Sequence, residues 1–145
     1  KALLTTAGVT PGKLRLAYDS SRPQMIAGGQ IIRENLKEIG FDVNNIEIDD
    51  RITEYDMGSI TGTPIKNISS LVLISAKDAE DTNEFKDRVY SCIKELSNLP
   101  ENILIVSHAG VGRILETIKE NKEAALFYDI PAYPNASVKI IDWII

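Results

Sequence analysis

A short apolar run leads into the only histidine of the sequence and is followed directly by a glycine-containing amphipathic segment. The run covers residues 103–106, the histidine is His108, and Gly110 and Gly112 stand at the start of the amphipathic segment. This order is typical of α/β proteins, in which a buried strand precedes a helix and ligands bind at the carboxyl ends of the strands. The unpaired N–H groups at the start of the helix also favour an anion. The segment therefore predicts an α/β fold with an anion site beside His108.

The same alternation of strand and helix patterns continues along the chain. Apolar or alternating runs predict strands at residues 2–6, 14–18, 43–48, 103–106 and 137–145, the last with Val138, Ile140 and Ile141 buried. Apolar residues at helical spacing predict helices at residues 23–39, 85–96 and 111–118, with one further turn at residues 123–128. We therefore expect a single domain, residues 1–145, folded as a three-layer α/β/α sandwich with a mostly parallel central sheet.

Several other segments are less regular. Residues 49–67 are rich in Gly, Thr, Asp and Pro and predict a long surface loop, and residues 78–83 are acidic and expected to be exposed. Residues 69–75 fit a strand or a helical turn equally well. Gly28 and Gly29 each weaken the helix that contains them by about 1 kcal/mol relative to alanine. Close packing of a backbone or ligand against that helix would explain these glycines.

Composition excludes several classes of function. The formal net charge of -5 argues against a nucleic-acid partner, which needs a basic surface to neutralise phosphates. No apolar run is long enough to span a membrane, so we expect a cytoplasmic protein without a membrane partner. Cys92 is the only cysteine, which excludes an internal disulfide, and its apolar helical face predicts a place in the core. Without a second histidine neither a metal nor another cofactor is expected, and the oligomeric state, a homo-oligomer included, stays open.

Three polar residues stand where chemistry on an anion would need them. His108 follows the apolar run, and histidine is a common acid, base and anion ligand; the alternative is a histidine satisfied inside the core. Arg22 lies between a predicted strand and a predicted helix, and its planar fork suits phosphate or carboxylate unless it is only a surface arginine. Glu54 lies in the glycine-containing loop, where a buried carboxyl group can act as a general acid and an exposed one is only solvated.

These residues fall in three sequence blocks. The blocks are S-S-R-P-Q-M-I-A at residues 20–27, R-I-T-E-Y-D-M-G-S-I-T-G at residues 51–62 and L-I-V-S-H-A-G-V-G-R at residues 104–113. In their order they resemble the motifs of the histidine phosphatase superfamily, in its phosphoglycerate mutase-like branch. Pro134 and Asn135, before the last predicted strand, also resemble a segment of that family. The likeness runs from about Tyr18 to the carboxyl terminus.

The resemblance implies a phosphatase or phosphoglycerate mutase-like enzyme that acts on a small phosphorylated metabolite through a phosphohistidine. It implies that His108 is the second active-site histidine, which stabilises charge in the transition state. It also implies that Glu54 protonates the leaving oxygen and that Arg22 binds the phosphate. Backbone N–H groups of Ala109 and Gly110 would add further donors to the phosphate. The family needs no metal, because its arginine and histidine groups supply the positive charge.

The nucleophile of that family, a histidine in an Arg-His-Gly motif after the first strand, has no counterpart here. In one register residues 3–10 form the first strand and its motif, with Thr6 in place of the arginine and Ala7 in place of the nucleophile. In the other register residues 4–8 match a later L-T-x-x-G segment, and the first strand lies upstream of Lys1. Both registers indicate missing or rearranged chain at the amino terminus. Without a nucleophile the covalent route cannot run.

Two alternatives to a complete enzyme therefore stay open. The first is a catalytically inactive phosphate-binding or interaction domain on the same fold, which the alanine at position 7 favours. The second is an unrelated nucleotide-binding α/β domain, suggested by Gly8, Gly12 and Lys13. These three residues lack the spacing of a phosphate-binding loop and the Ser or Thr that follows its lysine.

Overall fold

The computed structural model describes residues 6, 8, 10–18, 23–64, 69–100, 102–131, 133–135 and 137–141. The chain divides into two compact units. Unit 1 comprises Lys1–Thr53 and Asn98–Ser107, and unit 2 comprises Glu54–Ser97 and His108–Ile145. The chain thus enters unit 2 twice, directly before Glu54 and directly before His108.

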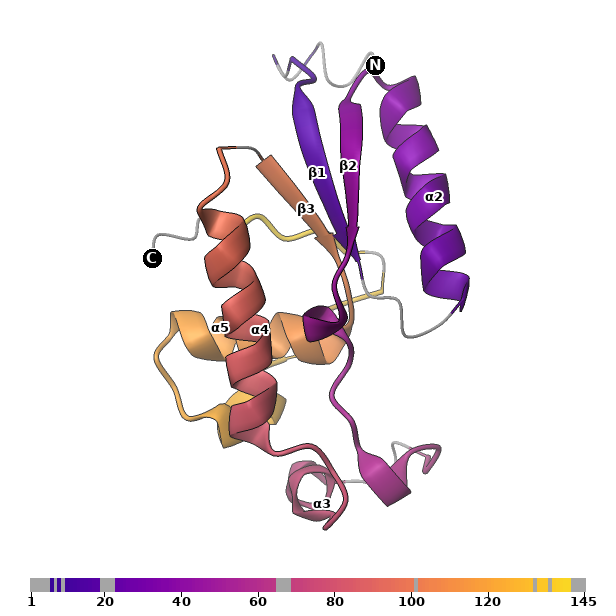
Figure 1. Ribbon diagram of the computed structural model, residues 1–145. Coiled ribbons are helices and arrows are strands. Elements are labelled where there is room, and N and C mark those ends of the chain that lie inside the picture. The colour runs from indigo at the N-terminus through magenta and orange to yellow at the C-terminus, as the bar shows by residue number, and fades with distance from the viewer. Residues whose placement is uncertain are drawn as a thin grey trace. The chain divides into compact units, whose positions relative to one another are not determined.

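Unit 1 is built on a parallel sheet (Figure 1). Its strands are β1 (Lys13–Tyr18), β2 (Asp42–Ile48) and β3 (Asn102–Val106), in the order β2-β1-β3. Tyr18 pairs with Ile48 on one side and Val106 on the other, so the carboxyl ends of all three strands meet at one edge. The prediction of a parallel sheet is confirmed for these strands.

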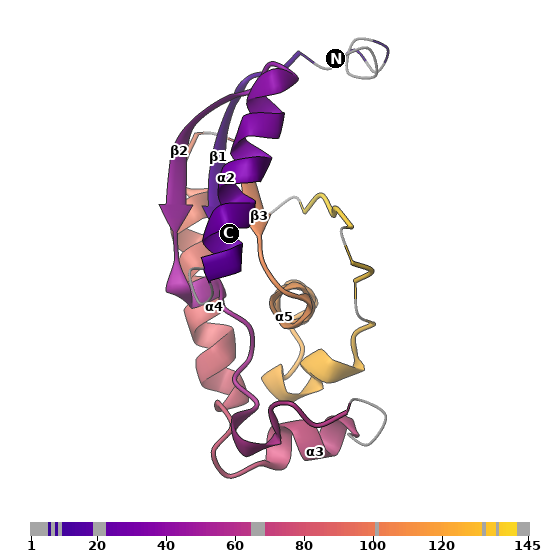
Figure 2. The ribbon, with the colours of Figure 1, turned by 90° about the vertical axis from the view of Figure 1, so that its right-hand side faces the viewer.

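Helix α2 (Pro23–Glu38) packs along one face of this sheet (Figure 2). Ile32 and Leu36 pack against a core in which Leu16 and Tyr18 are fully buried. Gly29 lies directly over the Tyr18 ring, because a Cβ at position 29 would come within 2.5 Å of that ring. The expectation of close packing is therefore met at Gly29 by a side chain of β1, whereas Gly28 has open space around it.

Short elements interrupt the loop predicted at residues 49–67. They are the 3-10 turns η1 (Asp50–Ile52) and η2 (Gly58–Ile60), and residues 65–68 lie outside the described residues. The ambiguous segment at residues 69–75 is helical and forms α3 (Ser70–Ser75), with the Ser69 side chain accepting a hydrogen bond from the Val72 amide. Of the strand predicted at residues 2–6 only Thr6 is described, and it is helical.

Unit 2 contains helices α4 (Thr82–Ser97) and α5 (Ala109–Lys119), which pack against each other and against the 3-10 helix η4 (Ala124–Asp129). Asp81 caps α4, since its carboxylate accepts the amides of Asn83 and Glu84 at 2.8 and 3.2 Å. The buried core of this unit includes Phe85, Val89, Cys92, Val111, Ile114 and Phe127. The prediction that Cys92 is a core residue is confirmed.

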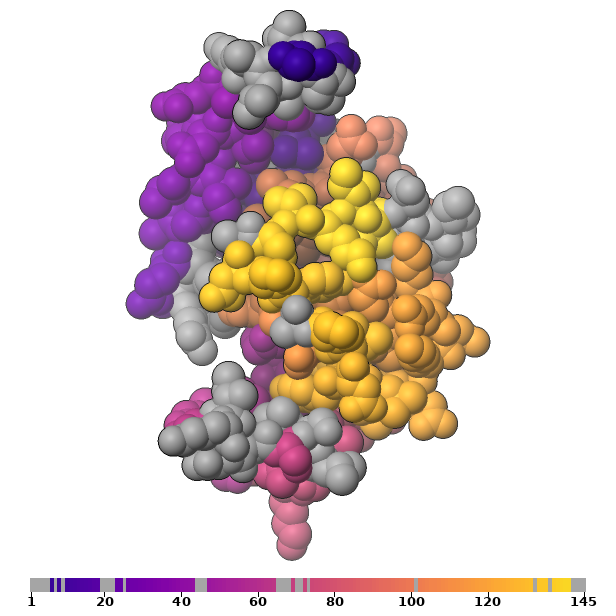
Figure 3. All heavy atoms as spheres, turned by 180° about the vertical axis from the view of Figure 1, so that it is seen from behind, coloured from indigo at the N-terminus to yellow at the C-terminus, as the bar shows by residue number. Residues whose placement is uncertain are grey.

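The strand predicted at the carboxyl terminus is wrong over its described part. Residues 137–141 are not in a strand, and Val138 and Ile140, expected to be buried, are 82% and 87% exposed. Figure 3 shows the end of the described chain, in yellow, at the surface. Valine and isoleucine fit a pleated surface well, but a strand also needs a partner backbone, and the described part of this segment pairs with none. Residues 142–145 lie outside the described residues.

Candidate functional site

The amino-terminal end of α5 carries the histidine singled out by the sequence. His108 is the residue before the helix, with extended backbone angles (φ -104°, ψ 168°), and its side chain is half-buried and does not cap the helix. Ala109 and Gly110 are the first two helical residues, Ala109 exposed and Gly110 buried. The first N–H groups of a helix have no partner within it, so this end of α5 attracts an acceptor or an anion.

Glu54 supplies that acceptor. Its Oε2 accepts the Gly110 N–H at 3.2 Å, and its Oε1 accepts the Tyr55 N–H at 2.9 Å. A Cβ on Gly110 would overlap the Glu54 carboxylate, so the contact depends on glycine at this position. The structure thus brings Glu54 and Gly110 together beside His108. The Gly110 amide, expected to face a phosphate, here donates to a carboxylate of the same chain.

The two segments that lead to Glu54 and His108 are joined within unit 1. Ser107 Oγ donates to the Ile52 carbonyl at 2.6 Å, although 55 residues separate them in sequence. Asp49 caps the turn that contains Ile52 and also binds the Arg51 side chain, with Oδ2 at 2.6 Å from Nη2. Because β2 and β3 both run parallel to β1, their carboxyl ends deliver these segments to the same edge of the sheet.

The Glu54 loop is held by two residues that the sequence analysis missed. Arg88 Nη2 donates to the Glu54 carbonyl at 3.1 Å and to Glu80 Oε2 at 2.9 Å. The expectation that residues 78–83 are exposed is wrong for Glu80, whose side chain is only 15% exposed because Arg88 covers it. One sequence signal points to this pair: Arg88 shares its helical face with the core residues Phe85 and Cys92, and a charge on such a face needs a partner.

Aromatic side chains border the Glu54 loop within unit 2. Tyr55 packs against Phe85, Phe127 and Tyr128, with ring centroids 5.2 to 6.1 Å apart. Burial, and next to it the negative charge of Glu54, raises the pKa of Tyr128 to about 12. The Arg113 guanidinium lies 5.3 Å from the centre of the Tyr128 ring and opposes this rise in pKa. The Tyr128 phenol therefore keeps its proton to a higher pH than an exposed tyrosine does.

Two further residues that the sequence analysis considered for the site, Arg22 and Ala7, lie outside the described residues. Lys13 is the first residue of a strand, so Gly8, Gly12 and Lys13 do not lead into a helix as a phosphate-binding loop would. Among the described residues there is no group of three or more His, Cys, Asp and Glu placed to hold a metal ion. Their helices also include none long and apolar enough to cross a membrane.

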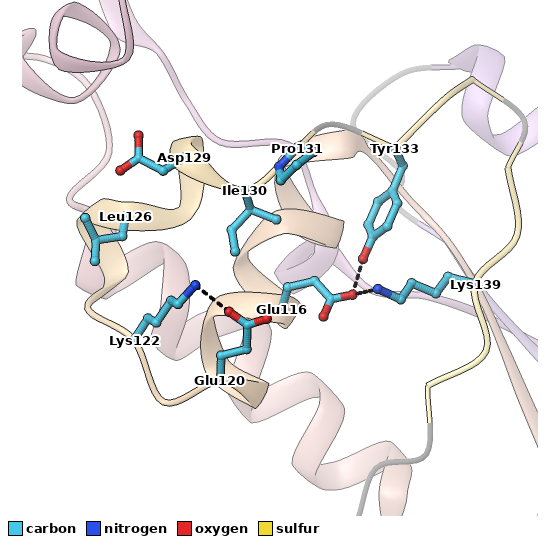
Figure 4. Close-up of a pocket in the computed structure, with 9 residues that line it drawn as sticks. All are labelled: Glu116, Glu120, Lys122, Leu126, Asp129, Ile130, Pro131, Tyr133 and Lys139. Carbon is cyan, nitrogen blue, oxygen red and sulfur yellow. Dashed lines mark hydrogen bonds and ion pairs between the residues drawn. The ribbon is translucent and has the colours of Figure 1, made fainter.

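A separate pocket of about 520 Å³ lies on the side of α5 that faces η4 (Figure 4). Glu116 reaches into it and accepts hydrogen bonds from the Tyr133 hydroxyl, at 2.5 Å, and from Lys139. Lys122 and Glu120 form an ion pair of 2.6 Å at its rim. None of the site residues expected from sequence lines this pocket, and its two lysines are already paired with glutamates. It is therefore not the anion site that the sequence indicated.

Comparison with solved structures shows the fold. Bacillus stearothermophilus YhfR matches with a TM-score of 0.62 at 17% identity, over 81% of this chain and 62% of that one. Mycobacterial glucosyl-3-phosphoglycerate phosphatase, in complex with inorganic phosphate, matches with a TM-score of 0.60 at 15% identity, over 84% and 66%. Shigella flexneri alpha-ribazole phosphatase matches with a TM-score of 0.51 at 22% identity, over 80% and 60%. The chain spans about two thirds of the length of these proteins, and the predicted α/β fold is confirmed.

Comparison with curated protein sequences gives no match. The family model of the histidine phosphatase superfamily (branch 1), by contrast, matches residues 29–144. This range includes Glu54, His108 and the end of α5 at which Gly110 binds Glu54, and Arg22 precedes it. The match covers most of the chain, and the solved structures of similar fold include phosphatases. The chain therefore belongs to the histidine phosphatase superfamily, branch 1.

Proposed function

We propose that this chain binds the phosphate of a small phosphomonoester beside His108 and supplies the charge-stabilising and proton-donating groups of a phosphohistidine reaction. The observation that carries the proposal is the Glu54 carboxylate, hydrogen-bonded to the Gly110 amide two residues after His108. An acidic group and an imidazole at the start of a helix suit an ester that receives a proton on its leaving oxygen. The two named phosphatases of similar fold support a small phosphorylated metabolite as the substrate.

In the reaction, a nucleophilic imidazole attacks phosphorus while the bond from phosphorus to the leaving oxygen breaks. Glu54 gives its proton to that oxygen, and His108 donates to the phosphoryl oxygens, whose charge grows in the transition state. Water then attacks the phosphohistidine and releases inorganic phosphate, with Glu54 taking back a proton. His108 is the only histidine of these 145 residues and cannot be both nucleophile and partner. Turnover therefore requires a second imidazole from outside this sequence.

A second candidate function is phosphate binding without catalysis, as an inactive or interaction domain on the same fold. The single histidine favours it, because the 145 residues contain no nucleophile of the family's kind. The Glu54 carboxylate at the α5 end is compatible with this function as well. Both candidates require His108 to contact the phosphate, and they differ only in turnover.

The experiment combines titration calorimetry with orthovanadate and a p-nitrophenyl phosphate hydrolysis assay. Free imidazole is added to the assay as the nucleophile, because these 145 residues contain no second histidine. For both candidates we expect His108→Asn to weaken vanadate binding by roughly tenfold or more, since a charged hydrogen bond is worth about 1.5–3 kcal/mol. Hydrolysis that falls by about 10²-fold in Glu54→Gln supports the enzyme. Binding without hydrolysis supports the inactive domain.

Lys122→Met is the control, because it removes a cation of unit 2 whose ion pair within the described part of the chain is with the exposed Glu120. This variant is expected to bind vanadate as the parent does. Vanadate binding that is absent from the parent, or equally weakened in Lys122→Met and His108→Asn, would reject both candidates.

A further inference from the structure

We propose that Arg88 is a positioning residue for Glu54: paired with Glu80, it holds the backbone of the Glu54 loop so that the carboxylate meets the Gly110 amide. The inference rests on the proposed role of Glu54 in proton transfer. Neither Arg88 nor Glu80 belongs to the sequence blocks that led to the site.

The Arg88 guanidinium binds three oxygen atoms that belong to two residues, Glu80 and Glu54. Its Nε lies 2.5 Å from Glu80 Oε1, and its Nη2 lies 2.9 Å from Glu80 Oε2. The same Nη2 donates to the Glu54 carbonyl at 3.1 Å, across 34 residues of sequence. A guanidinium presents these donors in a rigid plane, so the two bonds to Glu80 fix the direction of the third.

Glu80 holds the next two residues of the loop. Its backbone N–H donates to the Asp56 carbonyl at 2.9 Å, and its Oε2 accepts the Asp56 N–H at 3.3 Å. Its carbonyl accepts the Tyr55 hydroxyl at 2.5 Å. Three consecutive residues, Glu54, Tyr55 and Asp56, are thus each bonded to the Arg88–Glu80 pair. Because these bonds fix the backbone at Glu54, they keep the Glu54 carboxylate within reach of the Gly110 amide.

The surroundings make this pair hard to replace. The Arg88 and Glu80 side chains are 22% and 15% exposed, so water screens their attraction only partly. The guanidinium also lies 4.6 Å from the centre of the Phe85 ring, which fixes it from the other side. A lysine would keep the charge but lose the fork, and a methionine would fill the space without any donor.

The test compares the position of the Gly110 amide signal in NMR spectra, at one pH, with Glu and with Gln at position 54. In the parent we expect Glu54→Gln to move the Gly110 signal, because the substitution changes the acceptor of its hydrogen bond. In Arg88→Met we expect roughly half or more of that movement to be lost, and in Arg88→Lys a smaller loss. The Gly112 amide donates to the His108 carbonyl at 3.1 Å and serves as the internal control.

A kinetic measurement separates positioning from general destabilisation. If the parent hydrolyses p-nitrophenyl phosphate, Arg88→Met is expected to lower kcat by about 10- to 100-fold and to change KM by less than about threefold. The kcat of Arg88→Lys is expected to lie between those of the parent and Arg88→Met. The kcat of Lys122→Met is expected to match that of the parent. A purely structural role would instead reduce the folded fraction and leave the rate per folded molecule unchanged.

A Gly110 response that is missing in the parent, or complete in Arg88→Met, would overturn the inference. If Arg88→Met does not fold, the Gly110 response is measured in Glu80→Gln and Arg88→Lys instead. A full response in both of these variants would also reject the inference. The NMR readout needs no turnover. A parent without hydrolysis therefore counts against the catalytic proposal alone, while the Gly110 response still decides the role of Arg88.

Discussion

A glycine in a helix of each unit is pressed against a side chain from a distant segment, but the two side chains differ in kind. In unit 1, Gly29 of α2 receives the ring of Tyr18, which is buried to 1% exposure. In unit 2, Gly110 of α5 receives the carboxylate of Glu54, which also binds the Gly110 amide. Each glycine is needed for the approach of its neighbour.

The difference separates packing from chemistry. The Tyr18 ring completes a core with Leu16 and Val43, and its contact with Gly29 adds dispersion energy and excludes water. The Glu54 contact instead places a carboxyl group at the start of a helix that follows directly on a histidine. A close approach to a helix therefore says nothing about function until the approaching atoms are known.

The largest effect is expected for Gly110→Ala. The added Cβ overlaps the Glu54 carboxylate and displaces it from the Gly110 amide. We expect hydrolysis, where the parent shows it, to fall by about 10²-fold, the usual contribution of a general acid. Thermal unfolding should change less, because alanine regains up to about 1 kcal/mol of helix propensity. A variant with the activity of the parent would show that Glu54 works from another position.

Gly29→Ala should act on stability alone. The Cβ would collide with the fully buried Tyr18 ring, and overpacking of this kind costs about 1–3 kcal/mol. We expect a lower midpoint in urea with an unchanged slope, and an unchanged vanadate affinity for the folded protein. If Gly29→Ala lowered the vanadate affinity of the folded protein as much as Gly110→Ala does, the distinction between the two glycines would be lost.

A third test uses pH to measure how well the Tyr128 phenol, near Glu54, is shielded from water. The pKa of Tyr128 is raised to about 12, whereas an unfolded tyrosine ionises near pH 10. The unfolded chain therefore loses this proton first, so the stability due to Tyr128 is complete below about pH 10 and is lost as pH rises toward about 12. Between about pH 10 and 12 we expect the free energy of unfolding to fall by about 1–2 kcal/mol less in Tyr128→Phe than in the parent. Urea unfolding at several pH values measures this difference. Equal losses in both proteins would show that the Tyr128 phenol is not shielded from water.

The smallest effect is expected for Gly28→Ala, which is also the control for Gly29→Ala. Position 28 has open space around its Cα, so the new methyl group meets nothing. Alanine should stabilise α2 by about 0.5–1 kcal/mol through helix propensity. The midpoint in urea should rise slightly and vanadate affinity should stay the same. A destabilised Gly28→Ala would contradict the open space around position 28.

Much of the local structure could be predicted from the sequence. The strand patterns at residues 14–18, 43–48 and 103–106 and the helix patterns at residues 23–39 and 85–96 all appear close to their predicted bounds. These signals are local, because the spacing of apolar residues follows the period of the element that they occupy. The strand predicted at residues 137–145 is wrong over its described part, since strand formation needs a partner backbone that propensity does not report.

The candidate site was predicted less completely, and for a related reason. His108 follows from its place after a strand, whereas Glu54 was singled out mainly through its resemblance to a family motif. The pair of Arg88 and Glu80 was missed, because Glu80 stands in an acidic stretch that looks solvated. Only the fold shows that Arg88 covers Glu80 and reaches the Glu54 carbonyl.

By itself the sequence determined the parallel strands, the amphipathic helices and the position of His108 at the start of α5. The tertiary structure alone decided which group meets that helix end. The bond between Glu54 and Gly110 spans 56 residues, and the bond between Arg88 and the Glu54 carbonyl spans 34. Periodicity reports only neighbours within a few residues, so contacts of this range appear only when the chain has folded.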